Sequence, residues 1–185
     1  MSEAAARTDR AWGARDRDVE DLGSTEPFET FYIRELPRLV ALARALTGSA
    51  AAVEDVAQEA MIATFRRWDE VERLDVPAAW VRRVCANMST SYLRRRSSEA
   101  RTLRRLTSVR QRDPELEPDD ADFWVAVRRL PRRQAQAIAL HYLYDMSVTD
   151  IALTLECSQS TVKAHLVRGR AALARALGIS EEEQS

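Results

Sequence analysis

Apolar residues recur at steps of three and four along much of this chain, which is the period of an amphipathic helix. The run from Phe28 to Leu46 predicts a first helix, which Pro37 should bend or interrupt and Gly48 should end. A second helix over 51–68 is expected to start at a serine cap, Ser49. It points one stripe toward a core: Val53, Val56, Ala57, Ala60, Met61 and Phe65. Its adjoining side is left with Glu54, Asp55, Gln58, Glu59 and Ile62.

A third helix is expected over 78–96, after a break at 75–77. Its inner stripe predicts that Cys85 is a small buried hydrophobe rather than a ligand; the stripe is Val81, Val84, Cys85, Met88 and Tyr92. The opposite side carries a second set at helical spacing: Arg83, Asn87, Thr90 and Arg94. Three helices of this kind predict an all-helical first module.

The periodicity fades over 97–120 and returns in the last third of the chain. One helix there carries Phe123, Trp124, Val127 and Leu130 and is stopped by Pro131. The next, over 132–146, is expected to bury Ala135, Ile138, Ala139 and Tyr142. The prediction is an all-α chain of two small helical domains, a first module at 27–96 and a second module at 121–177. Flexible tails at 1–26 and 178–185 flank them and a flexible linker at 97–120 joins them, although the arginine-rich start of that linker could prolong the third helix.

The stretch 147–173 predicts two short helices that meet at a tight corner. Ser147 and Asp150 form a start signal resembling a capping box, and Ser158 can cap the second helix through its hydroxyl. Small and apolar residues alternate with these caps: Ile151, Ala152, Leu155, Val162, Leu166 and Leu173. This spacing is what a helix-turn-helix needs, and the second helix of that motif enters the DNA major groove. The alternative is an ordinary helical hairpin whose exposed side is polar.

Polar side chains lead the second helix of this corner. The residues at the front of this helix can contact base edges: Ser158, Gln159, Ser160, Thr161, Lys163, Ala164 and His165. Arg168 and Arg170 come later and are better placed for phosphates, which fix register without reading sequence.

The charge of the chain is unevenly distributed although its net value is only -1. Between Trp80 and Arg112 there are ten arginines and one acid, whereas 113–122 holds six acids and no base. This split indicates a basic surface for phosphate beside an acidic segment that avoids or imitates it.

Several other classes find no support in the sequence. The N-terminus lacks the apolar centre of a signal peptide and no run has the length of a membrane span, so a cytoplasmic protein without membrane insertion is expected. Cys85 and Cys157 form no CxxC pair, and His165 has no ligand cluster around it, so neither a disulfide framework nor a metal site is predicted. Without a nucleophile motif or a glycine-rich phosphate loop, we expect no enzyme, no cofactor and no small-molecule substrate.

Four stretches together resemble the sigma-70 family of bacterial RNA polymerase sigma factors, in its extracytoplasmic-function branch (group IV). EDVAQEAMIATFRRW is similar to region 2.2 and PAAWVRRVCANMSTSYLRRR to regions 2.3 and 2.4. LPRRQAQAIALHYLYDMSVTDIA is similar to region 4.1 and the opening of region 4.2, and CSQSTVKAHLVRGRAAL to the rest of region 4.2. The resemblance covers about 28–177, and it implies a subunit that directs core RNA polymerase to promoters.

The resemblance also implies a role for each surface. Asp55, Gln58 and Glu59 match positions that bind the clamp helices of the polymerase beta-prime subunit, and the beta flap is a second expected contact. The -10 promoter element would be opened and read by Trp80, Arg83, Asn87, Arg94, Arg95 and Arg96. Trp80 is also expected to pack at the helix start. The helix-turn-helix would bind the -35 element, and an anti-sigma factor is a further partner that the family admits.

Three residues depart from the family pattern. Ser91 stands where an acid is common, and Gly169 replaces an alanine in the recognition helix, which should weaken that helix. Glu156 stands where the corner has glycine, so it is strained unless the corner avoids a positive φ.

The acidic segment 113–122 resembles the family's connector and could mimic nucleic acid until RNA displaces it. The main alternative function is a homodimeric helix-turn-helix regulator of transcription.

Overall fold

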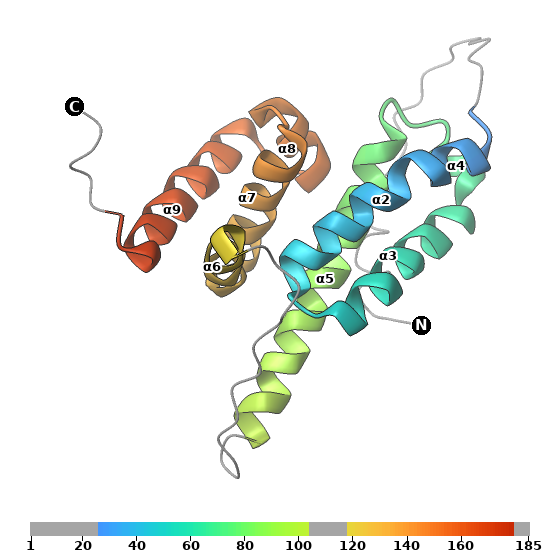
Figure 1. The fold of residues 1–185 in the computed structure, drawn as a ribbon. Helices are drawn as coiled ribbons and strands as arrows, with labels where there is room; N and C mark the ends of the chain where they lie inside the picture. Colours follow the sequence, from blue (N-terminus) through green and yellow to red (C-terminus); the bar gives the residue numbers. More distant parts are fainter. Residues whose placement is uncertain (1–25, 104–117, 180–185) are drawn as a thin grey trace.

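The computed structural model describes residues 26–103 and 118–179, with the side chains of 26–96 and 122–179 (Figure 1). Within these ranges the chain is helical and contains no strand, so the all-α prediction is confirmed. The helices are α2 (Phe28–Thr47), α3 (Ala50–Phe65), α4 (Trp68–Val71), α5 (Pro77–Leu103), α6 (Pro118–Arg129), α7 (Arg132–Tyr144), α8 (Val148–Leu155) and α9 (Gln159–Leu177). Residues 113–117 of the acidic segment lie outside the described residues, and 118–122 form the start of α6.

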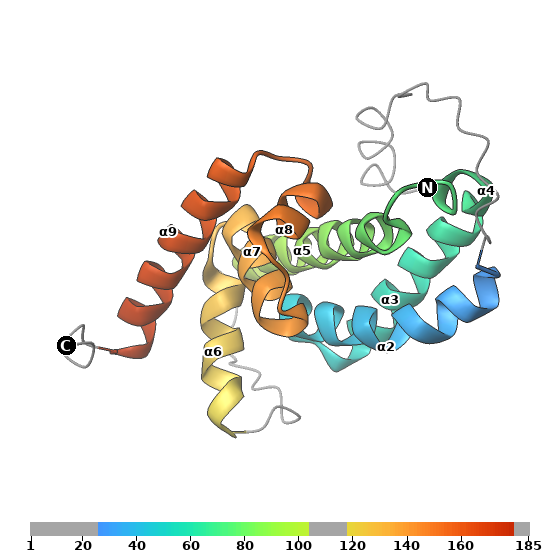
Figure 2. The ribbon, with the colours of Figure 1, turned by 90° about the horizontal axis from the view of Figure 1, so that it is seen from above.

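The first module is a bundle in which α2, α3 and α5 pack pairwise and α4 closes one end (Figures 1 and 2). Gly48 ends α2 in the left-handed region at φ 60°, and its N–H donates to the carbonyl of Arg44 at 3.0 Å, as its position predicted. Cys85 is fully buried, and its thiol donates to the carbonyl of Leu39 at 3.6 Å. The prediction of a small buried hydrophobe is therefore confirmed.

The first module also corrects three expectations. Pro37 does not interrupt α2, because it lies on the exposed side of the helix, where the carbonyl left without an N–H donor can be hydrated. Phe65 is 62% exposed rather than buried, since it is the last residue of α3 and only one side of its ring packs, on Phe28 at 4.9 Å between centroids. Ser49 occupies the N-cap position of α3, but its hydroxyl makes no capping hydrogen bond.

Helix α5 continues to Leu103, beyond the end expected near Arg96. The arginine-rich sequence allowed for this extension. The C-terminal part of α5 projects beyond the other helices in Figure 1.

The second module has α7 at its centre, in contact with α6, α8 and α9. Helix α9 crosses α7 closely at Gly169, where an added Cβ would lie 2.9 Å from Cγ1 of the fully buried Ile138. Tyr142 corrects a further expectation: it is 51% exposed, and its ring packs edge-on against Phe123 at 5.4 Å between centroids.

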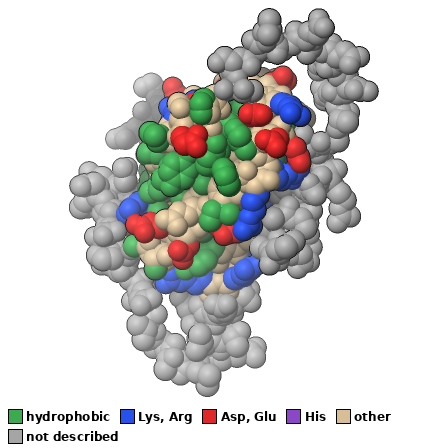
Figure 3. Space-filling view, turned by 90° about the vertical axis from the view of Figure 1, so that its right-hand side faces the viewer, with side chains coloured by type: hydrophobic (Ala, Val, Ile, Leu, Met, Phe, Trp, Pro, Cys, Tyr) green, Lys and Arg blue, Asp and Glu red, His purple; other side chains and the backbone are tan. Residues whose placement is uncertain are grey.

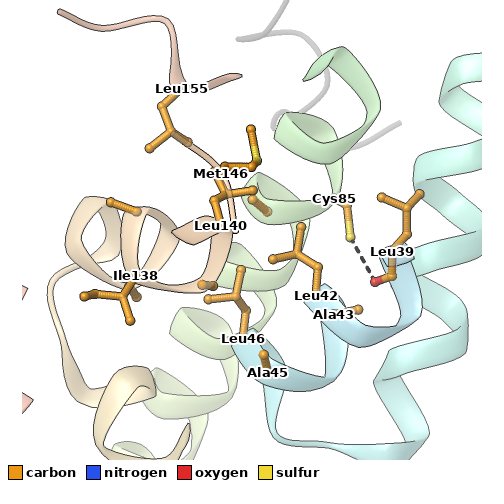
Figure 4. Close-up of a cluster of buried hydrophobic side chains, with 14 of the residues drawn as sticks. Leu39, Leu42, Ala43, Ala45, Leu46, Cys85, Ile138, Leu140, Met146 and Leu155 are labelled. Carbon is orange, nitrogen blue, oxygen red and sulfur yellow. Dashed lines mark hydrogen bonds between the residues drawn. The ribbon is translucent and has the colours of Figure 1, made fainter. Parts of the chain in front are cut away.

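The two modules pack against each other rather than standing apart on their linker. Helix α2 contacts α6 and α7, and α5 contacts α7 and α8. In Figure 4 the side of α2 that carries Leu42 and Leu46 faces α7, which carries Ile138 and Leu140. One apolar cluster therefore runs through both modules.

Candidate nucleic-acid interface

The corner between α8 and α9 is built by local hydrogen bonds. The hydroxyl of Ser147 accepts the N–H of Asp150 at 3.2 Å and donates to that residue's carboxylate at 2.7 Å. The hydroxyl of Ser158 accepts the N–H of Thr161 at 3.1 Å, so both predicted caps are confirmed. Between them Glu156 adopts φ 51° and ψ 54°, the left-handed conformation that the sequence identified as the condition for strain.

Helix α9 presents one side to α7 and the other to solvent. Its buried stripe consists of Val162, Leu166, Gly169 and Leu173. The residues predicted to bind the -35 element lie away from this stripe. Seven of them are exposed: Ser158, Gln159, Ser160, Thr161, Lys163, Arg168 and Arg170. Ala164 and His165 are half-buried. An exposed polar front on a capped helix that follows a tight corner has the form required for entry into a major groove.

One histidine, His141 of α7, lies beside this helix, and another, His165, lies within it. The Nε2 atom of His141 lies 2.9 Å from an Arg170 guanidinium nitrogen, and its Nδ1 atom lies 3.1 Å from the carbonyl of Met146. A guanidinium can only donate, so Nε2 is the acceptor in the contact with Arg170. For His165, burial is the main cause that lowers the pKa, and the charges of Arg133 and Arg168 add to it.

The predicted polymerase-binding residues of α3 lie together on an exposed face. Asp55, Gln58 and Glu59 follow helical spacing, and all three are exposed. Ile62 and Phe65 extend this face as exposed apolar residues. Figure 3 shows acidic and hydrophobic side chains side by side on this side of the molecule. Such a surface could bind a partner that presents both basic and apolar groups.

The predicted -10 residues of α5 divide into a covered set and an exposed set. Trp80 is 5% exposed, and the guanidinium carbon of Arg67 lies 5.9 Å from the centroid of the Trp80 ring. Both observations agree with a packing role. Arg83 is 3% exposed, and Asn87 is half-buried. Arg94, Arg95 and Arg96 are exposed beyond the contact with the second module.

The second module is what covers Arg83 and Asn87. The guanidinium of Arg83 contacts the carboxylate of Glu156 at the helix-turn-helix corner. Burial lowers the pKa of Arg83 to about 10, and the charges of Arg133 and Arg67 act in the same direction. The side-chain carbonyl of Asn87 accepts hydrogen bonds from Arg132 and from Gln136, the latter at 3.1 Å.

Sequence reasoning did not identify the residues that join the two modules. Gln136 is fully buried between α7 and α5, and Arg128 donates to the carbonyl of Ala45 near the end of α2 at 3.2 Å. Tyr144 donates to the carbonyl of Arg38, and Arg82 lies 5.0 Å from the centre of its ring. The only available signal was a glutamine at position 136 within an otherwise apolar helix segment.

Two kinds of feature are absent from the part of the chain that the structure describes. Residues 26–103 and 118–179 contain no helix long and apolar enough to cross a membrane. The same part of the chain contains no group of three or more His, Cys, Asp or Glu that could hold a metal ion.

Comparisons with known proteins match both modules. The family model for sigma-70 region 2 matches residues 31–99, and the model for sigma-70 region 4 matches residues 121–173. The RNA polymerase sigma-E factor of Streptomyces antibioticus is 31% identical over 121 residues, covering 65% of this chain and 67% of that protein. The ECF RNA polymerase sigma factor SigM of Mycobacterium tuberculosis is 28% identical over 157 residues, covering 84% of this chain and 80% of that protein.

Two solved structures share the fold. The sigma factor RpoE in complex with the anti-sigma factor NepR, from Bartonella quintana, has a TM-score of 0.65 at 24% identity, covering 83% of this chain and 98% of that chain. The structure of CnrH in complex with the cytosolic domain of CnrY has a TM-score of 0.60 at 22% identity, covering 82% of this chain and 87% of that chain.

Proposed function

This chain belongs to the sigma-70 family of RNA polymerase sigma factors, in its extracytoplasmic-function branch, and from this premise we propose which of its surfaces carry out initiation. A sigma factor directs transcription initiation by its polymerase. We assign docking on core polymerase to α3, -10 recognition to α5 and -35 recognition to α9. The polymerase supplies the chemistry, and the chain acts where that enzyme is, in the cytoplasm.

One observation carries this assignment: a region 2 match and a region 4 match lie on one chain in that order. A homodimeric helix-turn-helix regulator would need only the second. The face of α3 supports the docking role, because its exposed acids and amide complement a basic coiled coil, as the beta-prime clamp helices would present, and Ile62 adds apolar contact. The beta flap remains the partner we propose for the second module.

The division of labour on DNA follows from side-chain chemistry. At the front of α9, Gln159 and Lys163 can bond base edges, while Arg168 and Arg170 are suited to phosphates. On α5, arginines can hold a separated strand, and the amide of Asn87 can bond the edge of an unpaired base. We extend the proposal to an anti-sigma factor as a further partner, as in the complex of RpoE with NepR.

The test of the docking face is Asp55→Arg. Reversing this exposed charge should abolish co-purification with core polymerase and promoter-directed RNA synthesis, because it sets like charges against each other. A pull-down of the tagged chain from a lysate measures how much core polymerase it binds, and it also tests the anti-sigma partner, which would co-purify with the chain in place of the polymerase.

Asp69→Arg is the matched control, since Asp69 is an exposed acid of the first module on α4 rather than α3. It should leave polymerase binding unchanged. Full binding by Asp55→Arg would refute the docking face, and failure of the unmodified chain to bind any core polymerase would refute the proposed function.

A further inference from the structure

The middle of helix α7 is buried on all sides. Six consecutive residues are buried: Ala135, Gln136, Ala137, Ile138, Ala139 and Leu140. A helix at the surface of a small domain buries only a stripe, so continuous burial requires neighbours on opposite sides. Ile138 faces Gly169 of α9 within the second module. The other side of α7 must therefore be covered from elsewhere.

The first module provides that cover. Gln136, Leu140 and Tyr144 are spaced by four residues, so they lie along one side of α7. Gln136 contacts α5 and Tyr144 contacts α2, which places Leu140 between them in the contact between modules. Figure 4 shows Leu140 in the cluster shared with Leu42 and Leu46 of α2.

A buried amide specifies this contact. The Nε2 atom of Gln136 lies 3.2 Å from the carbonyl of Ala86, 3.1 Å from Oδ1 of Asn87 and 3.3 Å from Oγ1 of Thr90. Its own carbonyl accepts from Arg133 at 3.3 Å. A fully buried side chain whose donor and acceptor are both used fixes one relative position of two helices, because any slippage leaves polar atoms unpaired.

The second specific contact comes from the strained corner. Glu156 pays for a left-handed backbone that glycine would adopt without cost, and its carboxylate contacts the buried guanidinium of Arg83. A glycine would keep the corner and lose this ion pair. Glutamate at position 156 therefore favours the contact with α5, at the expense of a relaxed corner.

We propose that the second module is an intramolecular cover for the -10 face of α5, held by a latch of two residues, Gln136 and Glu156. This inference rests on the proposed function for its biological meaning, but the closed arrangement stands on the contacts alone. The latch occupies the two α5 residues, Arg83 and Asn87, that would otherwise meet the separated DNA strand. In the closed chain the docking face of α3 and the front of α9 remain exposed. The closed chain can therefore dock on polymerase before its -10 face opens.

Energy transfer between two dyes tests the latch in the full chain. Cysteines introduced at the exposed residues Arg73 and Arg175 place one dye on each module, in a Cys157→Ser background where the remaining Cys85 is buried. The unmodified chain should show mainly high transfer. Gln136→Glu keeps the size of the side chain but sets a carboxylate against the carbonyl of Ala86. The ratio of open to closed molecules should then rise about tenfold, the factor that corresponds to ~1.4 kcal/mol.

Glu156→Gly has a matched control in Asp145→Gly. Asp145 has the same left-handed conformation, at φ 50°, but its side chain is exposed. Both changes relieve backbone strain, and only Glu156→Gly should open the chain. Opening by both Glu156→Gly and Asp145→Gly would overturn the proposal. So would a closed chain in both latch variants, Gln136→Glu and Glu156→Gly, or low transfer in the unmodified chain. Thermal unfolding by circular dichroism confirms that each variant is folded.

Binding of a short mixed-sequence single-stranded DNA tests what the cover does. Opening should raise the affinity by about the factor gained in the open fraction, and adding Arg83→Ala with Asn87→Ala should remove that gain. An open variant without any gain would overturn the covering role. Polymerase binding through α3 should not change. If the unmodified chain does not bind core polymerase, the proposed function is refuted while the energy-transfer result still stands. Failure of the proposed function and failure of the latch are therefore distinguishable.

Discussion

At Gly169 two effects of a missing side chain oppose each other. Glycine inside a helix costs about 1 kcal/mol relative to alanine, so alanine should favour α9 by itself. The Cβ of that alanine would lie 2.9 Å from Cγ1 and 3.2 Å from Cδ1 of Ile138, however. Ile138 is fully buried, so its side chain has no room to move away. The close crossing of α7 and α9 therefore depends on the missing side chain.

We predict that Gly169→Ala lowers the free energy of unfolding by about 1 kcal/mol, since overpacking costs roughly 1–3 kcal/mol and helix propensity returns about 1 kcal/mol. Denaturant unfolding monitored by circular dichroism measures the difference. In an Ile138→Ala background the same change should be neutral or stabilising, because the opposing atoms are gone. Equal destabilisation in both backgrounds would contradict the crowding argument.

The elements show which predictions local sequence supports. The caps at Ser147 and Ser158 depend on residues three positions away, so the sequence contains everything that decides them. The exposure of Phe65 depends instead on where the neighbouring helix begins, and that of Tyr142 on how its ring packs against Phe123. Periodicity gave the buried stripe of α9 and hence its exposed front, but it could not show that the opposite side of α5 has a cover.

Helix α9 separates base reading from phosphate binding along its length. Gln159 stands in its first turn and Arg168 near its middle, and both are exposed. We predict that Arg168→Ala weakens holoenzyme binding to all promoters alike and reduces the slope of log affinity against log salt by roughly 0.9, the value for one phosphate contact. Gln159→Ala should instead change preference at one or two bases of the -35 element.

Promoters identified by mapping transcription start sites after overexpression provide the DNA for this measurement. Salt titrations on a matched set, with substitutions confined to the -35 element, separate the two effects. Uniform weakening by both variants on every sequence would show that α9 does not divide its contacts in this way.

The arrangement of the whole molecule lay beyond sequence reasoning for a physical reason. Gln136 and Ala86 are 50 positions apart, and no periodic pattern links residues at that separation. The linker between the two modules predicted that they move independently, whereas the side chains along α7 and α5 hold them in contact. The ion pair between Arg82 and the buried Glu35, at 2.9 Å, strengthens the same junction, because Arg82 also lies over the ring of Tyr144.

Shared burial makes a prediction about how the chain unfolds. One apolar cluster spans both modules, so neither can lose its structure without exposing apolar surface on the other. The unmodified chain should therefore unfold in a single calorimetric transition whose van't Hoff and calorimetric enthalpies agree. With Gln136→Glu and Glu156→Gly combined, the contact weakens while the core of each module is retained, and two transitions should separate. Asp145→Gly, which leaves the contact intact, should retain one. Two transitions in the unmodified chain would mean that the modules are energetically independent, whatever their distance, and that the latch holds too weakly to keep the -10 face covered.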